Sequence, residues 1–538
     1  MATGPGTITP QELRGRLHDG GEIAIVDARE EGSFHERHLL MASCLPLSRL
    51  ELLAPALLPR RSAPVVLCDA GDGLAGRAAK RLIEGGWSDV AVLSGGVGAW
   101  EAAGFPVYSG VHVPSKAFAE VVEHEMKTPW ISAEELARRQ EAGEKLSIFD
   151  SRSYEEYHSN SIPGALSVPG AELVYRFQEL VPSPATFVVV NCGGRTRSII
   201  GAQSLIDAGV PNPVVSLKDG TMAWHLAGFE VVAGATGRAP EVSAEGIAAA
   251  RQRADAVARR YGVPVIDRAQ LVRWQNESDR RTLYLLDVRD PAEYSAGHLP
   301  GSLMAPGGQL VQETDSWLAI WGARVVLVDD TGVRARMTAS WLRRMGWDAA
   351  VLDNGFASGP AGASLATGMA AADAGMFPLA GPEPEMVTAD KLHADPAAIV
   401  VDLALSRDHR RGHIPGAWFA VRARLGSALA RLPTAGDLVL TSEDGIVARY
   451  AAAEMAPQAG RQVRVLAGGT AAWKAAGLPI EPGMGRLADE PDDVALSARD
   501  RPAERERYMR EYLAWEIDLV NQIARDADCR FRLAARAE

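Results

Sequence analysis

The sequence is poor in cysteine, with only Cys44, Cys68, Cys192 and Cys529 among 538 residues. These four residues are far apart and form neither a C-x-x-C pair nor the Cys/His spacing of a zinc site. We therefore expect no disulfide framework and no structural metal, because both need clustered ligands. A reduced, cytoplasmic setting is the prediction that follows.

Long apolar runs and an excess of positive charge are also missing. No run reaches the roughly 18 apolar residues of a transmembrane helix, and the N-terminus lacks the basic and apolar regions of a signal peptide. The formal net charge is −12. Since nucleic acids and anionic membranes bind clustered Lys and Arg, we expect neither as a partner.

What the sequence does contain is a fourfold internal repeat. The composition is that of a globular protein, and the length suits about three to five domains. Four apolar segments end in aspartate, namely Asp27, Asp150, Asp287 and Asp402. A second apolar segment follows in each copy: PVVLCD, FVVVNC, RVVLVD and DLVLTS. Copies one, two and four close on related patterns ending in a tryptophan, whereas copy three has only LDNGFASG.

Each copy alternates apolar strands with helices, a pattern typical of an α/β fold with a small, mainly parallel sheet covered by helices on both faces. We place four such domains at 7–108, 130–233, 265–361 and 385–482. Residues 241–261 are Ala/Arg-rich and predict a helical linker, and 361–384 predict a loose connector. A C-terminal helix at 504–527 has one apolar face, so we expect it to dock on a domain or on a dimer mate.

One position distinguishes the second copy from the others. The separation from Asp27 to Asp69 equals that from Asp150 to Cys192 and that from Asp287 to Asp329. In copy four the matching residue is near Ser442, two positions earlier. Ligand sites in open α/β sheets lie outside the carboxyl ends of the strands, and only copy two has a cysteine there. Cys192 is thus the candidate nucleophile, while an aspartate in its place repels anions.

The loop that opens at this cysteine reads Cys192, Gly193, Gly194, Arg195, Thr196, Arg197 and Ser198. Two glycines let the backbone turn tightly and direct successive N–H groups inward. We expect Ser198 to cap the following helix, whose N-terminus adds partial positive charge. With Arg195 and Arg197 beside it, Cys192 should have a depressed pKa and bind an anionic substrate.

Together these motifs resemble the rhodanese family. The resemblance rests on Asp150 and Arg152 after the first strand, the I-P-G-A turn at 162–165, the cysteine loop, and G-T-M-A-W at 220–224. It covers most of the chain as four consecutive rhodanese-like domains. It departs from the common pattern at Arg195, where many family loops have glycine, and at Ser161, where histidine is common.

The resemblance implies an activity. In this family a loop cysteine accepts a sulfane sulfur as a persulfide and passes it to a nucleophile such as cyanide or a thiol, without a cofactor. Inactive domains are often joined to an active one, so we expect domain two to be catalytic and domains one, three and four to be inactive. Asp150 and Arg152 are expected to support the floor of the loop.

Three functions remain open from the residues. The first is a sulfurtransferase that uses Cys192, with thiosulfate favoured over mercaptopyruvate because Arg195 and Arg197 can neutralise a dianion. The second is a non-catalytic binding or scaffold protein, which three degenerate domains would favour. The third is a rhodanese-fold phosphatase, although Arg197 comes one residue too early for the larger phosphatase loop.

Overall fold

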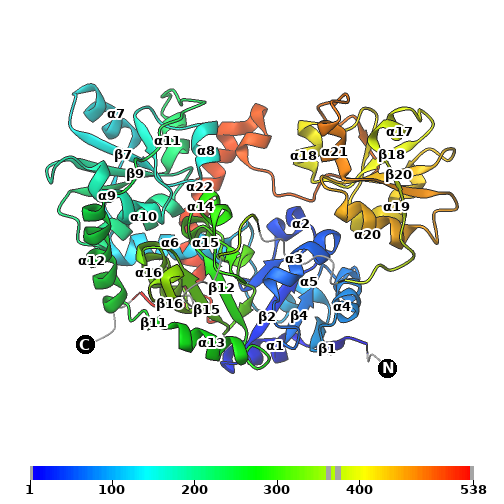
Figure 1. Ribbon diagram of the computed structural model, residues 1–538, viewed down its shortest axis with the longest axis horizontal. Helices are drawn as coiled ribbons and strands as arrows, with labels where there is room; N and C mark the ends of the chain where they lie inside the picture. The colour runs from blue at the N-terminus through cyan, green and yellow to red at the C-terminus, as the bar shows by residue number, and fades with distance from the viewer. Residues whose placement is uncertain (1–3, 359–364, 370–376, 534–538) are drawn as a thin grey trace.

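Four β-sheets, each flanked by helices, make up the fold (Figure 1). The computed structural model describes residues 4–358, 365–369 and 377–533. Parallel pairing dominates every sheet, which confirms the predicted class of four small α/β domains. Residues 359–361 at the end of the third expected domain, and residues 361–364 and 370–376 of the expected connector at 361–384, lie outside the described residues.

The elements of the first two domains follow one order, with strands and helices alternating. In domain one they are β1 Gly6–Ile8, α1 Pro10–His18, β2 Ile23–Asp27, α2 Glu31–Glu36, β3 Ala42–Cys44, η1 Leu47–Arg49, α3 Leu50–Leu57, β4 Val65–Cys68, α4 Leu74–Glu84, β5 Val90–Leu93 and α5 Gly96–Ala102. In domain two they are β6 Trp130–Ile131, α7 Ala133–Glu141, β7 Leu146–Asp150, α8 Tyr154–Ser159, β8 Ala165–Ser167, α9 Glu172–Leu180, β9 Phe187–Asn191, α10 Thr196–Asp207, β10 Val214–Leu217 and α11 Gly220–Leu226.

The third and fourth domains repeat this order with short additions. Domain three contains β11 Val265–Ile266, α13 Arg268–Asn276, β12 Leu283–Asp287, α14 Pro291–Ala296, β13 Leu303–Met304, α15 Gly307–Gln312, η2 Thr314–Ser316, β14 Ile320–Trp321, β15 Arg324–Val328, α16 Val333–Arg344, β16 Asp348–Leu352 and η3 Gly355–Ser358. Domain four contains β17 Glu385–Val387, α17 Ala389–His393, β18 Ile399–Asp402, α18 Ser406–Arg411, β19 Trp418–Phe419, η5 Arg422–Arg424, α19 Leu425–Ala428, η6 Leu429–Arg431, β20 Leu438–Thr441, α20 Ile446–Met455, β21 Val463–Leu466, α21 Gly469–Ala475 and β22 Arg486–Leu487.

The sheet of domain two, in the order β6-β10-β9-β7-β8, shows why these strands are apolar throughout. Side chains alternate between faces along a strand. Val189 packs into the cluster under α7 and α11, while Val188 and Val190 pack into the cluster under α9 and α10. Because helices cover both faces, the central strands β9 and β10 are almost entirely buried, and neither has a face in water.

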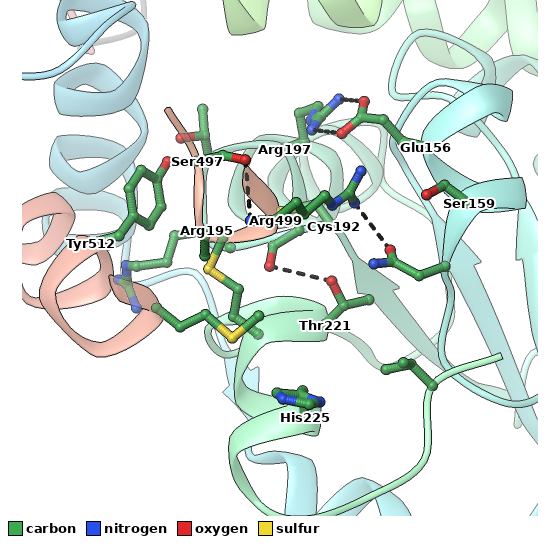
Figure 2. A pocket seen from close by; sticks show the side chains of 18 of the residues that line it. Glu156, Ser159, Cys192, Arg195, Arg197, Thr221, His225, Ser497, Arg499 and Tyr512 are labelled. Atoms are coloured by element: carbon green, nitrogen blue, oxygen red, sulfur yellow. Dashed lines mark hydrogen bonds and ion pairs between the residues drawn. The ribbon is translucent and has the colours of Figure 1, made fainter. Parts of the chain in front are cut away.

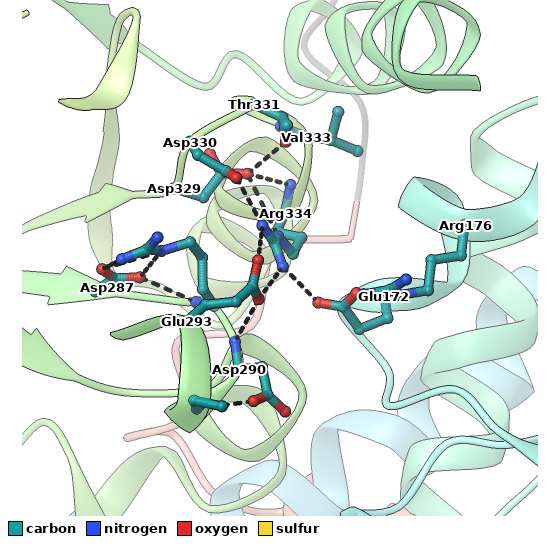
Figure 3. A network of polar contacts seen from close by, with 12 residues as sticks. Glu172, Arg176, Asp287, Asp290, Glu293, Asp329, Asp330, Thr331, Val333 and Arg334 are labelled. Carbon is teal, nitrogen blue, oxygen red and sulfur yellow. Dashed lines mark hydrogen bonds and ion pairs between the residues drawn. The ribbon is translucent and has the colours of Figure 1, made fainter. Parts of the chain in front are cut away.

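Domain three is joined to domains one and two. Its short strand β14 pairs antiparallel with β2 at the edge of the domain-one sheet, and Trp321 Nε1 donates to the Met41 carbonyl at 3.1 Å. On the other side, the fully buried Arg334 donates to Glu172 of domain two at 2.9 Å (Figure 3). The same guanidinium also binds Glu293 and Asp330 of its own domain. Domains one, two and three therefore pack as one assembly.

Helices outside the repeats complete this assembly. The predicted linker helix is present as α12, Ala244–Arg260, packed against α9 and α16. A helix that the sequence analysis did not predict, α6 Val113–Met126, follows domain one in the chain and lies largely buried against α10 of domain two and α22. After η7 Ala498–Asp500 and η8 Pro502–Glu504, the C-terminal α22, Arg505–Ile523, packs on α6. In Figure 1 this red segment crosses from domain four to domain two.

Among the helices in residues 4–358, 365–369 and 377–533, none combines the length and the apolar character that a membrane span needs.

Candidate active site

Cys192 directly follows β9, at the carboxyl end of the parallel strands. Its side chain is 2% exposed, and its Sγ lies 3.6 Å from Ser198 Oγ. The Cys192 carbonyl accepts from the amide of Thr221 at 2.9 Å. The Gly193 carbonyl accepts from the hydroxyl of the same threonine at 3.3 Å (Figure 2). These two hydrogen bonds fix the cysteine loop against the start of α11.

The same position can be identified in every domain from the backbone. In each, a glycine with positive φ begins the closing helix, and a Cβ there would overlap the carbonyl oxygen of one residue after the second long strand. The pairs are Gly96 with Asp69, Gly220 with Cys192, Gly355 with Asp329, and Gly469 with Ser442. Aspartate, aspartate and serine therefore occupy the place of Cys192 in domains one, three and four.

In domain one, a carboxylate fills the loop that corresponds to the cysteine loop. Asp69 Oδ1 accepts from the amide of Gly71 at 2.8 Å. Its Oδ2 accepts from the amides of Gly73 and Ala75 at 3.0 and 2.9 Å. Successive N–H groups of this turn and of the following helix thus converge on one anion, as in an anion-binding nest.

Domain three repeats this arrangement with an added guanidinium. Asp329 accepts from the amides of Gly332 and Arg334 at 2.6 and 3.1 Å. The Nε of Arg334 lies 3.7 Å from the same carboxylate (Figure 3). An arginine five residues after the nucleophile position can therefore face an anion at that position while it is paired elsewhere.

Arg197 is the counterpart of Arg334 in domain two. Its guanidinium pairs with Glu156 at 2.8 Å and reaches Gln309 of domain three at 3.0 Å (Figure 2). The pair between Arg334 and Glu293 has the same form, since Glu156 and Glu293 are both the third residue of a capped helix. Figure 2 shows Arg197 beside the Cys192 pocket. Arg197 is therefore placed to face an anionic sulfur.

Arg195 lies differently from what the sequence analysis expected. Its side chain is 4% exposed, and its guanidinium binds Glu120 at 2.6 Å, Asp219 at 2.7 Å and also Glu123. The two glutamates come from α6, which the repeat pattern does not reveal. With three carboxylates around it, Arg195 carries no surplus charge for a substrate. It ties the loop to α6 instead.

Two further expectations about the loop are wrong. Helix α10 begins at Thr196 with Arg195 in the N-cap position, so Ser198 lies inside the first turn, where its hydroxyl donates to the Arg195 carbonyl at 2.7 Å. Burial raises the pKa of the Cys192 thiol, opposed by Arg197 and by hydrogen bonding to Ser198. The expected depression counted the positive charge of the loop but not the cost of burying a thiolate, which is the largest effect on this pKa.

Asp150 and Arg152 form a fully buried ion pair beneath the loop. The guanidinium contacts the carboxylate at 2.6 and 2.9 Å and donates to the Asn160 carbonyl at 2.5 Å. Asn191, next to Cys192, contacts the same carboxylate at 3.4 Å. The pair thereby connects the first strand, the turn after α8 and the end of β9.

A cavity of about 640 Å³ opens over the cysteine loop (Figure 2). One wall belongs to domain two and includes Glu156 and His225. The opposite wall comes from the C-terminal segment, with Arg499, Tyr512 and Glu516, and Gln312 of domain three completes the lining. Thr196 joins the two walls, since its hydroxyl donates to Glu516 at 2.8 Å.

The sequence analysis missed the residues of this second wall. Residues 497–516 lie outside the repeats, and no copy-to-copy comparison could single them out. Glu156 could have been found from the sequence, because Ser153 and Glu156, three residues apart, form the capping box that marks the start of a helix. Within the described residues, no group of three His, Cys, Asp or Glu side chains is arranged to hold a metal ion.

The family model of the rhodanese-like domain matches residues 9–103, 132–227, 267–359 and 386–476. These matches cover well over half of the chain, so the protein belongs to the rhodanese family. Each match contains the central strands of one of the four sheets described above.

A solved relative has the same arrangement over its whole length. The crystal structure of a thiosulfate sulfurtransferase from Pseudomonas aeruginosa superposes with a TM-score of 0.93 at 46% identity, covering 98% of this chain and 100% of that one. Two curated relatives match over short stretches. An HTH-type transcriptional regulator of Mycobacterium tuberculosis is 38% identical over 105 residues, and an uncharacterized protein of Synechocystis is 32% identical over 117. The matches span 45% and 63% of those relatives, and 20% and 21% of this chain.

Replacing Arg152 by Ala should destabilise domain two strongly, because it leaves the Asp150 carboxylate buried without its partner. Breaking a buried pair costs about 3–5 kcal/mol. Arg138→Ala is the matched control, since Arg138 pairs with Glu135 on the exposed face of α7 and such pairs contribute little. Thermal unfolding of the full chain measures both, and equal midpoints for the two variants would contradict the assigned role.

Proposed function

We propose that this protein is a sulfurtransferase that moves a sulfane sulfur from thiosulfate to a thiol or cyanide through a persulfide on Cys192. Domain two is the catalytic unit in this proposal, and domains one, three and four are inactive. The relative of similar length and arrangement from Pseudomonas aeruginosa, described as a thiosulfate sulfurtransferase, supports the choice of reaction.

The observation that supports the proposal most directly is that the loops of domains one and three each hold an aspartate carboxylate. Asp69 and Asp329 put a carboxylate into a cradle of backbone N–H groups at the position of Cys192. A cysteine is one atom shorter than an aspartate and ends in sulfur, so its loop can receive an external anion bonded to that sulfur. The inactive loops therefore indicate what the cysteine loop binds during the reaction.

The chemistry follows from this geometry. The Cys192 thiolate attacks the outer sulfur of thiosulfate, and a bond forms between the two sulfurs. The bond from the outer sulfur to the sulfonate breaks, and sulfite leaves with the electron pair. Arg197 and the loop N–H groups stabilise the negative charge on the persulfide, as donors in an oxyanion hole do.

Both substrates have room in the cavity. Thiosulfate is compact, and the cavity of about 640 Å³ extends from Cys192 to the C-terminal segment. In the described part of the chain, the Arg499 guanidinium forms no ion pair, and its one hydrogen bond goes to the Asn160 amide oxygen, at 3.1 Å. Its charge supports binding of anionic substrates at the mouth of the cavity.

Replacing Cys192 by Ser should abolish thiosulfate-dependent sulfur transfer, because the hydroxyl cannot take up the sulfur. Steady-state release of thiocyanate from thiosulfate and cyanide measures it, with Cys68→Ser as the control, since Cys68 is buried in the core of domain one. Mass spectrometry of the thiosulfate-treated wild type should find one added sulfur on the peptide that contains Cys192. Activity that survives Cys192→Ser would refute the assignment.

Replacing Arg197 and replacing Arg195 should have different effects. Arg197→Gln should lower kcat/KM for thiosulfate about tenfold, since about 1.4 kcal/mol of charge stabilisation is lost. Arg195→Gln leaves Glu120 and Glu123 without their partner, so its main effect should be a lower unfolding midpoint. Kinetics and thermal unfolding of both variants test this assignment, and a larger loss of kcat/KM in Arg195→Gln would reverse it.

A further inference from the structure

A carboxyl group from outside the catalytic domain reaches the floor of the Cys192 cavity. Glu516 belongs to α22 and lies beside Gly194, where a Cβ would come within 3.2 Å of its Oε2. Its Oε1 accepts from Thr196 at 2.8 Å, whereas Oε2 has no hydrogen-bond partner among the described residues. Glu516 is 1% exposed and Cys192 is 2% exposed, and both residues line the same cavity.

The surroundings of Glu516 favour a group that can take up a proton. Burial raises its pKa, opposed by Lys116, by Thr196 and by Arg195. Lys116 is a buried residue of α6 whose Nζ lies about 5 Å from the Tyr512 and Trp515 rings. The other titratable groups that face Glu516 are Glu120 of α6, Tyr512 of α22 and Cys192 itself. A carboxylate with a raised pKa is a better base than an exposed one.

The transfer of sulfur from thiosulfate to Cys192 gives this base nothing to do once the thiolate has formed. The second transfer is different when the acceptor is a thiol. A neutral thiol is a weak nucleophile, and it must lose its proton as its sulfur attacks the persulfide. The group that accepts this proton must lie in the cavity near Cys192, and Glu516 meets this condition.

We propose that Glu516 accepts the proton of a small thiol as that thiol takes the sulfane sulfur from Cys192. The acceptor sulfur bonds to the outer sulfur of the persulfide, and the bond between that sulfur and Cys192 Sγ breaks. The electron pair stays on Cys192 as thiolate, the product leaves as a persulfide, and the proton passes from Glu516 to solvent. This role rests on the persulfide function proposed above and assigns its acceptor to the thiols.

Single-turnover kinetics on the full chain separate the two transfers. Thiosulfate alone should give a burst of sulfite, which tests the persulfide function, and Glu516→Gln should leave this burst no slower than in the wild type. The protein that carries the added sulfur is then mixed with reduced glutathione at pH 6.5, and loss of this sulfur is followed by mass spectrometry. Absence of the burst in the wild type would refute the persulfide function and, with it, the assignment of Glu516.

The expected defect in the second transfer depends on pH. At pH 6.5 only about 1% of a thiol with a pKa of about 8.5 is ionised, so Glu516→Gln should slow transfer to glutathione up to about 100-fold. At pH 8.5 about half of the thiol is ionised, and the defect should shrink to about twofold. A defect that is independent of pH, or one that is equal in the sulfite burst, would overturn the role of Glu516.

Two further variants control for structural effects. Glu511→Gln changes an exposed carboxylate on the same helix, paired with Arg507 at 3.7 Å, and should leave both transfers unchanged. Glu516→Asp retains a carboxylate and should recover part of the rate at pH 6.5. It also keeps the proposal testable if Glu516→Gln lowers the stability of the chain, and an aspartate variant as slow as the glutamine variant would count against proton transfer.

Discussion

A buried ion pair at the end of the first long strand determines where the cysteine loop can lie. Asp150 and Arg152 connect that strand to the turn after α8 and, through Asn191, to the end of β9. Domains one and three use the same pair, with Arg29 and Arg289 donating to the corresponding turn carbonyls at 2.6 Å. Domain four has lost the arginine, and His409 takes its place at 2.7 Å from Asp402. A buried partner for this aspartate is thus present in all four domains, whether that partner is an arginine or a histidine and whether or not the loop has a cysteine.

On this common floor, one side chain decides what each loop holds. The backbone N–H groups of the loop attract an anion wherever the chain provides them. An aspartate supplies that anion from within, so the loops of domains one and three are satisfied without a ligand. In the proposed function a cysteine leaves this place to an anionic substrate, and the loop that begins with a cysteine is that of domain two. The same geometry thus serves as a stable turn in two domains and as a candidate binding site in a third.

The repeats made part of this structure predictable. Strand ends at Asp150 and Cys192 follow from aligning four copies of one pattern, because the spacing of a packed α/β unit is narrowly fixed. The environment of Arg195 could not be predicted in this way, since Glu120 and Glu123 lie on a helix that belongs to no repeat. The expected depression of the Cys192 pKa was wrong because burial raises that pKa, and the burial of this thiol is a property of the whole fold that the local sequence does not show. A pKa depends on every charge nearby in space, and the sequence shows only those nearby along the chain.

The cavity over Cys192 is built by several parts of the chain besides domain two. Domain two provides the sulfur, the N–H groups and Arg197. Domain three holds Arg197 from behind through Gln309, and α6 holds Arg195. The C-terminal segment closes the remaining side after crossing from domain four. Residues 132–227 alone would expose Thr196 and Gly194 to water where Glu516 and Tyr512 now lie. A charge interaction is stronger where water is excluded. Domain three, α6 and the C-terminal segment therefore act on the proposed chemistry through burial.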